Sequence, residues 1–356
     1  MYTIIGAGIG GLTTALVFEK LNIEYQLFEK TKAPNALGAG IWLAPNALQV
    51  LEFTSVLNPV FKVGNVINRI TLSNKKLEPL ADSSQLPAKE KYGFSTLAIH
   101  RAKLQLTLIE AIPKEKIHWN KAIKSFKQSK DSVTVTFTDG TQMQSQYLIG
   151  ADGINSKVRS QLFPKSQIRY SGQTCWRGVM KKALPKEFKD RGIEMWGKGV
   201  RFGLSQLSAH ETSWFAVKNS KAFQKDDKTI LKQELLKMFK NFHQSIYRYV
   251  ESSSVTPYSK GSRDKNLEAI FVGLAKVNGV KGPGLVPSDK KYTEEAKNWI
   301  LDSVREVDPE EESATEIELN RIIKVWENAV VDNHGSMGKN AEGTNLLGKQ
   351  GGFKNP

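Results

Sequence analysis

Apolar and polar positions along the first 30 residues repeat with two different periods. A short apolar run, Tyr2–Ile5, predicts a buried strand, and residues 9–21 place their apolar side chains on one face of a helix. A second strand is expected over Glu24–Glu29. A strand, a loop, a helix and a strand within about 30 residues make up the length of a βαβ unit. The pattern therefore predicts a parallel sheet that begins at the first residues.

The next part of the chain mixes helical and strand patterns. Arg101–Ile112 has helical spacing, and the polar stretch Asp82–Glu90 is expected to be a loop between strands. Ser132–Thr138 alternates strictly between polar and apolar residues, as a half-buried strand does. Asp139-Gly140 predicts a hairpin turn onto a strand over Gln142–Ile149.

The remaining pattern predicts a second kind of sheet. Short strands dominate residues 169–217, which is typical of an antiparallel sheet, and residues 226–250 predict one amphipathic helix. The fold class expected is therefore α/β, with a Rossmann-like parallel sheet and a separate antiparallel sheet. The last 25 residues are rich in Gly, Asn and Lys and are expected to be disordered.

The first predicted strand leads into a glycine loop with the spacing G-x-G-x-x-G. Its first glycine, Gly6, turns the chain off the strand, Gly8 lets the backbone approach a pyrophosphate, and Gly11 lets helix and strand pack closely. The amides at the helix start then face the anion. Glu29 ends the second strand, where its carboxylate can accept the ribose hydroxyls and repel a 2′-phosphate. The candidate dinucleotide-binding residues are Gly6, Gly8, Ile9, Gly10, Gly11, Glu29 and Lys30.

Composition and charge narrow the possible compartments and ligands of the protein. The single cysteine excludes an intrachain disulfide and fits a reducing compartment, and no secretory signal or transmembrane run is visible, which predicts a cytoplasmic protein. The net charge is +15, and residues 276–356 hold 11 Lys/Arg and 14 Asp/Glu, so the first 275 residues carry +18. The lysines are scattered, which favours a solvated basic surface over nucleic-acid or anionic-membrane binding. The histidines share no metal-ligand spacing, so no metal site is expected.

A second motif gives the cofactor. Gly150-Ala151-Asp152-Gly153-Ile154-Asn155-Ser156-Lys157-Val158-Arg159 resembles the second flavoprotein fingerprint of the FAD-dependent aromatic-ring monooxygenases, most closely the urate hydroxylase, salicylate hydroxylase and zeaxanthin epoxidase branch of the para-hydroxybenzoate hydroxylase-like enzymes. Gly38–Ala47 is similar to the loop of that family that borders the flavin, and Ile99–Leu104 resembles the element whose arginine contacts FAD. The resemblance covers roughly residues 1–220.

The resemblance implies a cofactor, a reaction and a site. It implies FAD as the cofactor, held also by Gly40, Arg101, Asp152 and Gly153, with NAD(P)H as co-substrate. The expected reaction inserts oxygen from O2 into a small aromatic or conjugated substrate through a flavin C4a-hydroperoxide. Arg177 and Arg201 are candidates for holding an anionic substrate or phenolate, although on an antiparallel sheet they are equally well explained as outward salt-bridge residues.

The family's third motif, G-D-A-A-H, is altered. Leu274 stands where its aspartate is expected, and Lys276 lies near the histidine position. Two alternatives to a monooxygenase therefore stay open, a flavin dehydrogenase or reductase without oxygen insertion and a flavin-free relative that acts as a binding protein. The expected division is an FAD-binding domain over 1–75 and 98–168, a substrate domain over 76–97 and 169–258, an atypical helical segment over 259–330 and a disordered tail over 331–356.

Overall fold

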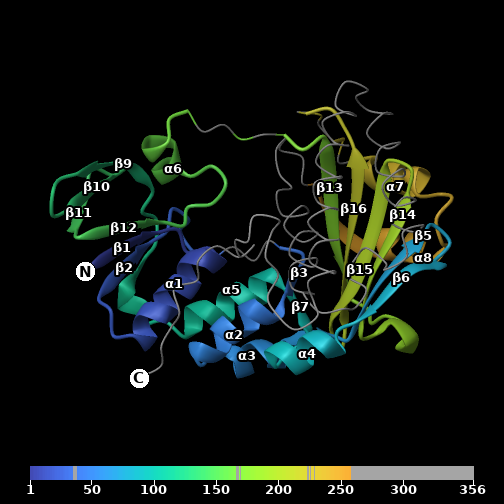
Figure 1. The fold of residues 1–356 in the computed structure, drawn as a ribbon. Helices are drawn as coiled ribbons and strands as arrows, with labels where there is room; N and C mark the ends of the chain where they lie inside the picture. The colour runs from blue at the N-terminus through green and yellow to red at the C-terminus, as the bar shows by residue number, and fades with distance from the viewer. Residues whose placement is uncertain are drawn as a thin grey trace, which may run out of the picture.

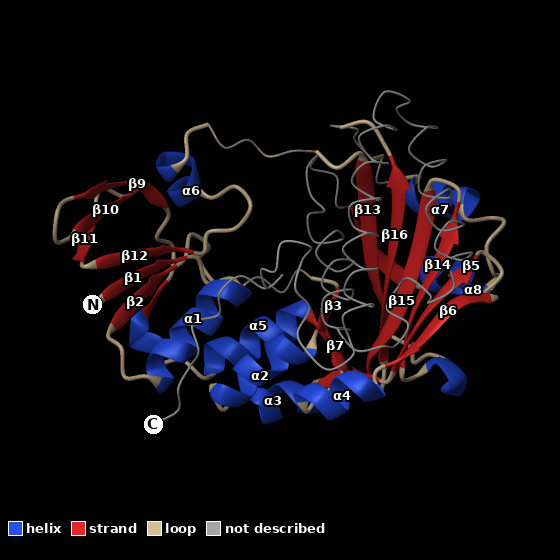
Figure 2. Cartoon of the chain, in the orientation of Figure 1, coloured by secondary structure: helices blue, strands red, loops and turns tan. Residues whose placement is uncertain are grey.

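The computed structural model of the chain describes residues 1–34, 38–165, 168, 170–222, 224, 226–227 and 229–257. A parallel sheet lies at one end of the molecule and a large mixed sheet at the other (Figure 1). Helices α1 to α5 run between the two sheets along one side (Figure 2). The expected segments 259–330 and 331–356, with Leu274 and Lys276, lie outside the described residues.

The N-terminal sheet has four parallel strands in the order β12-β1-β2-β8. Its strands are β1 (Tyr2–Ile5), β2 (Tyr25–Phe28), β8 (Ile117–His118) and β12 (Tyr147–Gly150). The predicted βαβ unit is present, because helix α1 (Ile9–Lys20) joins the neighbouring strands β1 and β2. The predicted α/β class with a Rossmann-like parallel sheet is confirmed.

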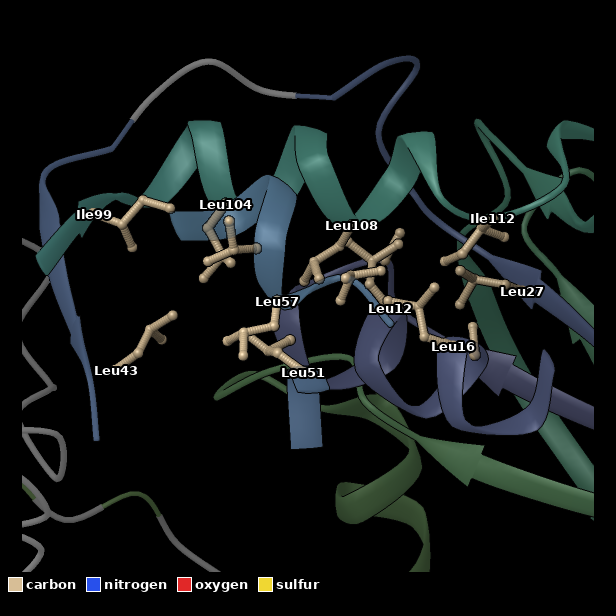
Figure 3. Close-up of a cluster of buried hydrophobic side chains, with 14 of the residues drawn as sticks. Leu12, Leu16, Leu27, Leu43, Leu51, Leu57, Ile99, Leu104, Leu108 and Ile112 are labelled. Atoms are coloured by element: carbon tan, nitrogen blue, oxygen red, sulfur yellow. The ribbon is translucent and has the colours of Figure 1, made fainter. Parts of the chain in front are cut away.

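A continuous apolar core attaches the helices to this sheet. Leu12 and Leu16 of α1 face Leu104 and Leu108 of α5 (Arg101–Glu110), and all four side chains are buried (Figure 3). Helices α2 (Pro45–Phe53) and α3 (Leu57–Lys62) add further leucines to the same cluster. The helical period predicted for both α1 and α5 is therefore what buries these leucines.

Two small three-stranded sheets complete the fold, one beside the parallel sheet and one packed against β15 (Val200–Ser208) and β16 (Glu211–Asn219) of the large sheet. One is an antiparallel meander of β9 (Ile123–Gln128), β10 (Val133–Phe137) and β11 (Gln142–Ser145), and it confirms the predicted hairpin. Gly140 in its turn has a φ of +86°, a left-handed conformation that favours glycine. The other pairs β7 (Thr96–His100) with β3 (Gly40–Leu43) and β4 (Gly64–Ile67).

The large sheet has the strand order β17-β13-β16-β15-β14-β5-β6. All neighbouring pairs are antiparallel except β14 with β5, so the predicted antiparallel sheet is confirmed with one parallel pair. The strands are β5 (Arg69–Asn74), β6 (Pro79–Ser84), β13 (Gln173–Met180), β14 (Arg191–Gly197), β15 (Val200–Ser208), β16 (Glu211–Asn219) and β17 (Ser253–Pro257). The shorter elements are α6 (Lys157–Leu162) and two 3-10 helices, η1 (Lys114–Lys116) and η2 (Lys186–Phe188).

Two local expectations differ from the structure. The polar segment expected to be a loop forms the end of β6 and helix α4 (Leu86–Tyr92), where Pro87 in the first turn and Gly93 at the C-cap mark the boundaries. The single helix expected over residues 226–250 is two helices, α7 (Leu231–Met238) and α8 (Ser245–Glu251). Between them, Phe239 and Phe242 turn inward and pack edge to face. Within the described part of the chain, no helix is long and apolar enough to span a membrane.

Candidate functional site

The glycine loop between β1 and α1 has the geometry that its sequence predicts. Gly6 has a φ of +106°, and a Cβ built there would lie 2.4 Å from the carbonyl oxygen of Ala151. A Cβ at Gly11 would lie 1.9 Å from the carbonyl oxygen of Gly6, so helix and strand touch at this glycine. By contrast, a Cβ at Gly8 or Gly10 would meet nothing within 4 Å. These two glycines therefore border open space, as a loop that receives a ligand does.

The start of α1 offers donors to an anion. No side chain caps the helix, and no acidic residue lies in its first turn. The N-terminus of a helix carries a partial positive charge and unpaired amides, which together favour a phosphate. Gln105 of α5 holds the glycine loop in place, because its Nε2 donates to the carbonyl oxygen of Ala7 at 2.7 Å.

Glu29 lies against this loop at the end of β2. Its Oε2 accepts from the Ala7 amide at 2.8 Å, and its Oε1 accepts from the Thr31 amide at 2.9 Å. Each carboxylate oxygen has capacity for a further hydrogen bond. The carboxylate is therefore fixed beside the loop with acceptor positions left for hydroxyl groups. Lys30, the next residue, is exposed.

Helix α5 brings a cation to the same region. The amide of Arg101 donates to the carbonyl oxygen of Ala39 at 3.0 Å, and a Cβ at Gly38 would touch the Arg101 side chain at 3.3 Å. The half-buried guanidinium has no hydrogen bond or ion pair to any residue that the structure describes. Burial lowers the pKa of His100 below 6.5, so the neutral ring can accept from the Ala102 amide through Nδ1 and cap α5.

The second fingerprint lies next to the glycine loop. Ala151 donates its amide to the carbonyl oxygen of Ile5 at 2.8 Å, and β12 pairs directly with β1. The Asp152 carboxylate accepts from Ser156 Oγ at 2.5 Å and from the Lys157 amide at 2.6 Å, so it caps helix α6. Gly153 has a φ of +78° and open space at its Cβ position. The carboxylate of Asp152 is therefore engaged with α6, while the backbone of the motif borders the loop.

The two candidate arginines lie on the large sheet. Arg201 donates through Nη1 to Glu194 Oε1 at 3.0 Å and through Nη2 to Gln173 Oε1 at 3.1 Å. Arg177 lies two strands away, on β13. The large sheet touches the start of β3, because a Cβ on Gly40 would lie 2.1 Å from Ser213 Oγ of β16. Gly40 therefore lies where the sheet of β3, β7 and β4 meets the large sheet.

Sequence reasoning missed two residues of this arrangement. Gln105 lies one helical turn after Arg101 and so on the same face of α5, a spacing that could have identified it. Glu194 is the ion-pair partner of Arg201. The sequence signal for Glu194 is the tight turn between Gly197 and Val200, since it sets the strand register that brings Glu194 and Arg201 together. No cluster of His, Cys, Asp or Glu suited to a metal ion occurs among the described residues.

The residues present fit a flavin adenine dinucleotide. A glycine cradle open at Gly8 and Gly10, a carboxylate at the end of β2 and an unpaired guanidinium on α5 match a pyrophosphate and a ribose. Fold and site together define a Rossmann-like dinucleotide-binding protein with a second, sheet-based domain.

Comparison with known proteins gives the family. The FAD binding domain family matches residues 2–259. The aurachin C monooxygenase/isomerase of Stigmatella aurantiaca is 31% identical over 250 residues, which are 70% of this chain and 65% of that protein. The 2-heptyl-3-hydroxy-4(1H)-quinolone synthase of Pseudomonas aeruginosa strain UCBPP-PA14 is 34% identical over 216 residues, 60% of this chain and 55% of that protein. The chain thus spans less than two thirds of the length of these two relatives.

A solved structure shows the same fold. Klebsiella pneumoniae HpxO, complexed with FAD and uric acid, superposes with a TM-score of 0.67 over 93% of this chain and 97% of that chain at 19% identity. The chain belongs to the FAD binding domain family of FAD-dependent monooxygenases, as the resemblance of its motifs implied. Its relatives include monooxygenases and an FAD-dependent urate hydroxylase.

Proposed function

We propose that the chain is an FAD-dependent monooxygenase that uses NAD(P)H and O2 to hydroxylate or epoxidise a small aromatic or conjugated substrate. The observation that carries the proposal is the position of Glu29, whose carboxylate is fixed by the Ala7 amide beside a glycine cradle open at Gly8 and Gly10. The family match over residues 2–259 supports FAD as the group that this cradle holds.

Each part of the site has a role in binding. The amides at the start of α1 hold the pyrophosphate, and Glu29 accepts from the adenosine ribose. The guanidinium of Arg101 lies free to offset phosphate charge. The backbone of Gly150–Gly153 borders the pyrophosphate, and Asp152 contributes indirectly by holding α6 in place.

FAD, when bound, supplies the redox chemistry, in which NAD(P)H gives two electrons, one atom of O2 enters the substrate and the other leaves as water. The protein contributes position and exclusion of water. The face of the large sheet that meets Gly40 is the surface on which the substrate rests, with Arg177 and Arg201 among its residues. The aromatic side chains of the sheet's other face form its core and take no part in binding.

The visible spectrum of the purified protein tests the cofactor. Oxidised-flavin bands, present as purified or after added FAD and gel filtration, are expected. NAD(P)H oxidation stimulated by an aromatic compound and incorporation of label from ¹⁸O2 then test oxygen insertion. Absence of flavin bands after reconstitution would overturn the proposal.

Two outcomes identify the alternatives. Flavin reduction and substrate turnover without label from O2 would indicate a dehydrogenase or reductase. A protein that binds aromatic ligands but never retains FAD would indicate a flavin-free binding protein, which the replacement of the motif aspartate by Leu274 favours. A lost hydrogen bond to that aspartate would weaken FAD binding by roughly 1.5–3 kcal/mol.

A further inference from the structure

A chain of hydrogen bonds crosses four strands of the large sheet. Gln173 of β13 donates to Asn219 of β16 at 3.1 Å and accepts from Arg201 of β15 at 3.1 Å. Arg201 donates to Glu194 of β14 at 3.0 Å, and the indole of Trp196 donates to the same carboxylate oxygen at 3.0 Å. The register places all five side chains on one face of the sheet.

That face is the one turned toward the proposed flavin site. The opposite face carries Phe202, Leu204 and Trp214, which pack against α7 and α8. Four residues along β15 from Arg201, Ser205 points to the same side and accepts from the Trp42 indole of β3 at 2.9 Å. Four residues of strand span roughly 13 Å, which leaves room for a one- or two-ring molecule between the β3 contact and the arginine.

The Glu194–Arg201 pair is electrically neutral and still reaches the surface. The side chain of Glu194 is 16% exposed and that of Arg201 is 14% exposed. Glu194 Oε2 has no hydrogen-bond partner among the described residues, and the Nε of Arg201 has none either. The pair therefore presents one acceptor, Glu194 Oε2, without net charge.

We infer that the Glu194–Arg201 pair selects a neutral heteroaromatic substrate whose ring carries an N–H. The inference rests on the proposed function, since it names the substrate class of that site. Glu194 Oε2 accepts the ring N–H, while Arg201 holds the Glu194 carboxylate in place through Nη1. A carboxylate substrate gains no net attraction from this pair, because Glu194 already neutralises Arg201.

The test compares two bicyclic aromatic ligands by calorimetry on the FAD-loaded protein, with no turnover required. The probes are 4(1H)-quinolone, which is neutral, and 1-naphthoate, which is anionic. The wild type is expected to bind the quinolone at least roughly tenfold more tightly. Glu194→Gln keeps the shape of the side chain but leaves Arg201 uncompensated, so the preference is expected to invert.

A second variant separates charge from geometry. The double variant Glu194→Gln with Arg201→Gln is neutral again and is expected to regain the preference for the quinolone with weaker binding. Glu90→Gln is the matched control, because Glu90 is exposed and has no interaction partner among the described residues. An unchanged preference in Glu194→Gln, an equal loss for both probes, or no binding of either probe by the wild type would overturn the inference. FAD content, read from the visible spectrum, reports separately on the proposed function.

Discussion

Glu29 and Ala7 are joined by a 2.8 Å hydrogen bond from the Ala7 amide to the Glu29 carboxylate. The bond ties the end of β2 to the glycine loop at the end of β1, 22 residues earlier. It fixes an acidic group at the edge of the parallel sheet where the helix amides of α1 are also exposed. The glycine loop, the Glu29 carboxylate and the first amides of α1 thus lie together, and each can be altered by a separate substitution.

Replacing Glu29 by glutamine removes the charge and turns an amide N–H₂ toward one of two backbone donors, at Ala7 or Thr31. Hydrogen bonds to a charged group contribute about 1.5–3 kcal/mol. FAD affinity is expected to fall roughly ten- to hundredfold, as measured by flavin fluorescence on titration of the apoprotein. Glu90→Gln should bind FAD as the wild type does, and equal affinity in both variants would contradict the assignment.

Gly8→Ala adds a methyl group into the open space of the loop. Because no protein atom lies within 4 Å of that position, the apoprotein is expected to unfold at the same temperature as the wild type. The methyl group meets the pyrophosphate instead, and overpacking of this kind typically costs about 1–3 kcal/mol of binding. Calorimetric titration with FAD measures the loss, and the melting temperature of the apoprotein is the control.

Gly11→Ala makes the opposite change in the same motif. Its Cβ would lie 1.9 Å from the carbonyl oxygen of Gly6, so α1 must move away from β1. The free energy of unfolding of the apoprotein is expected to fall by about 3 kcal/mol, as measured in urea. A loss of stability in Gly8→Ala equal to that in Gly11→Ala would show that the two glycines do not have separate roles.

Arg101→Gln removes a guanidinium that has no partner among the described residues. The stability of the apoprotein should therefore stay within about 0.5 kcal/mol of the wild type. FAD affinity is expected to fall, and its dependence on salt concentration should become shallower, because one phosphate contact is lost. The measurement is FAD titration at several ionic strengths, and an unchanged salt dependence would count against a phosphate contact.

Lys103 and Glu211 join helix α5 to β16 through a 2.6 Å ion pair. The hydrogen bond from Lys103 lowers the pKa of Glu211 below its ordinary value of 4.5. Because the folded pKa is depressed, the pair stabilises the fold above about pH 4.5, and this contribution is lost as the pH falls through the folded pKa. Partial exposure limits the contribution to at most about 1 kcal/mol.

The corresponding variant is Glu211→Gln. Urea unfolding at pH 7 should show it slightly less stable than the wild type, and the difference should shrink toward zero in a series down to pH 3.5. Glu90→Gln is expected to show no such convergence. A difference that stays constant across the series would mean that the ion pair is not its source.

Local patterns in the sequence were sufficient to predict the glycine loop, the hairpin and the family. The glycine spacing set the turn at Gly6 and the close packing at Gly11, since only residues without a Cβ fit there. Strict alternation and the Asp139-Gly140 turn gave the hairpin of β10 and β11. The motifs gave the family, which the match over residues 2–259 confirms.

Only the tertiary structure decided which partner each charged side chain takes. The motif that contains Asp152 predicts a cofactor contact, which stays a prediction, and the fold shows what the motif did not, that its carboxylate also accepts from the Ser156 hydroxyl and the first amides of α6. Arg201 was considered as a holder of an anion, but strand register places Glu194 beside it and neutralises the charge. Local spacing fixes backbone conformation, whereas the partner of a long side chain depends on which strands and helices meet across the fold.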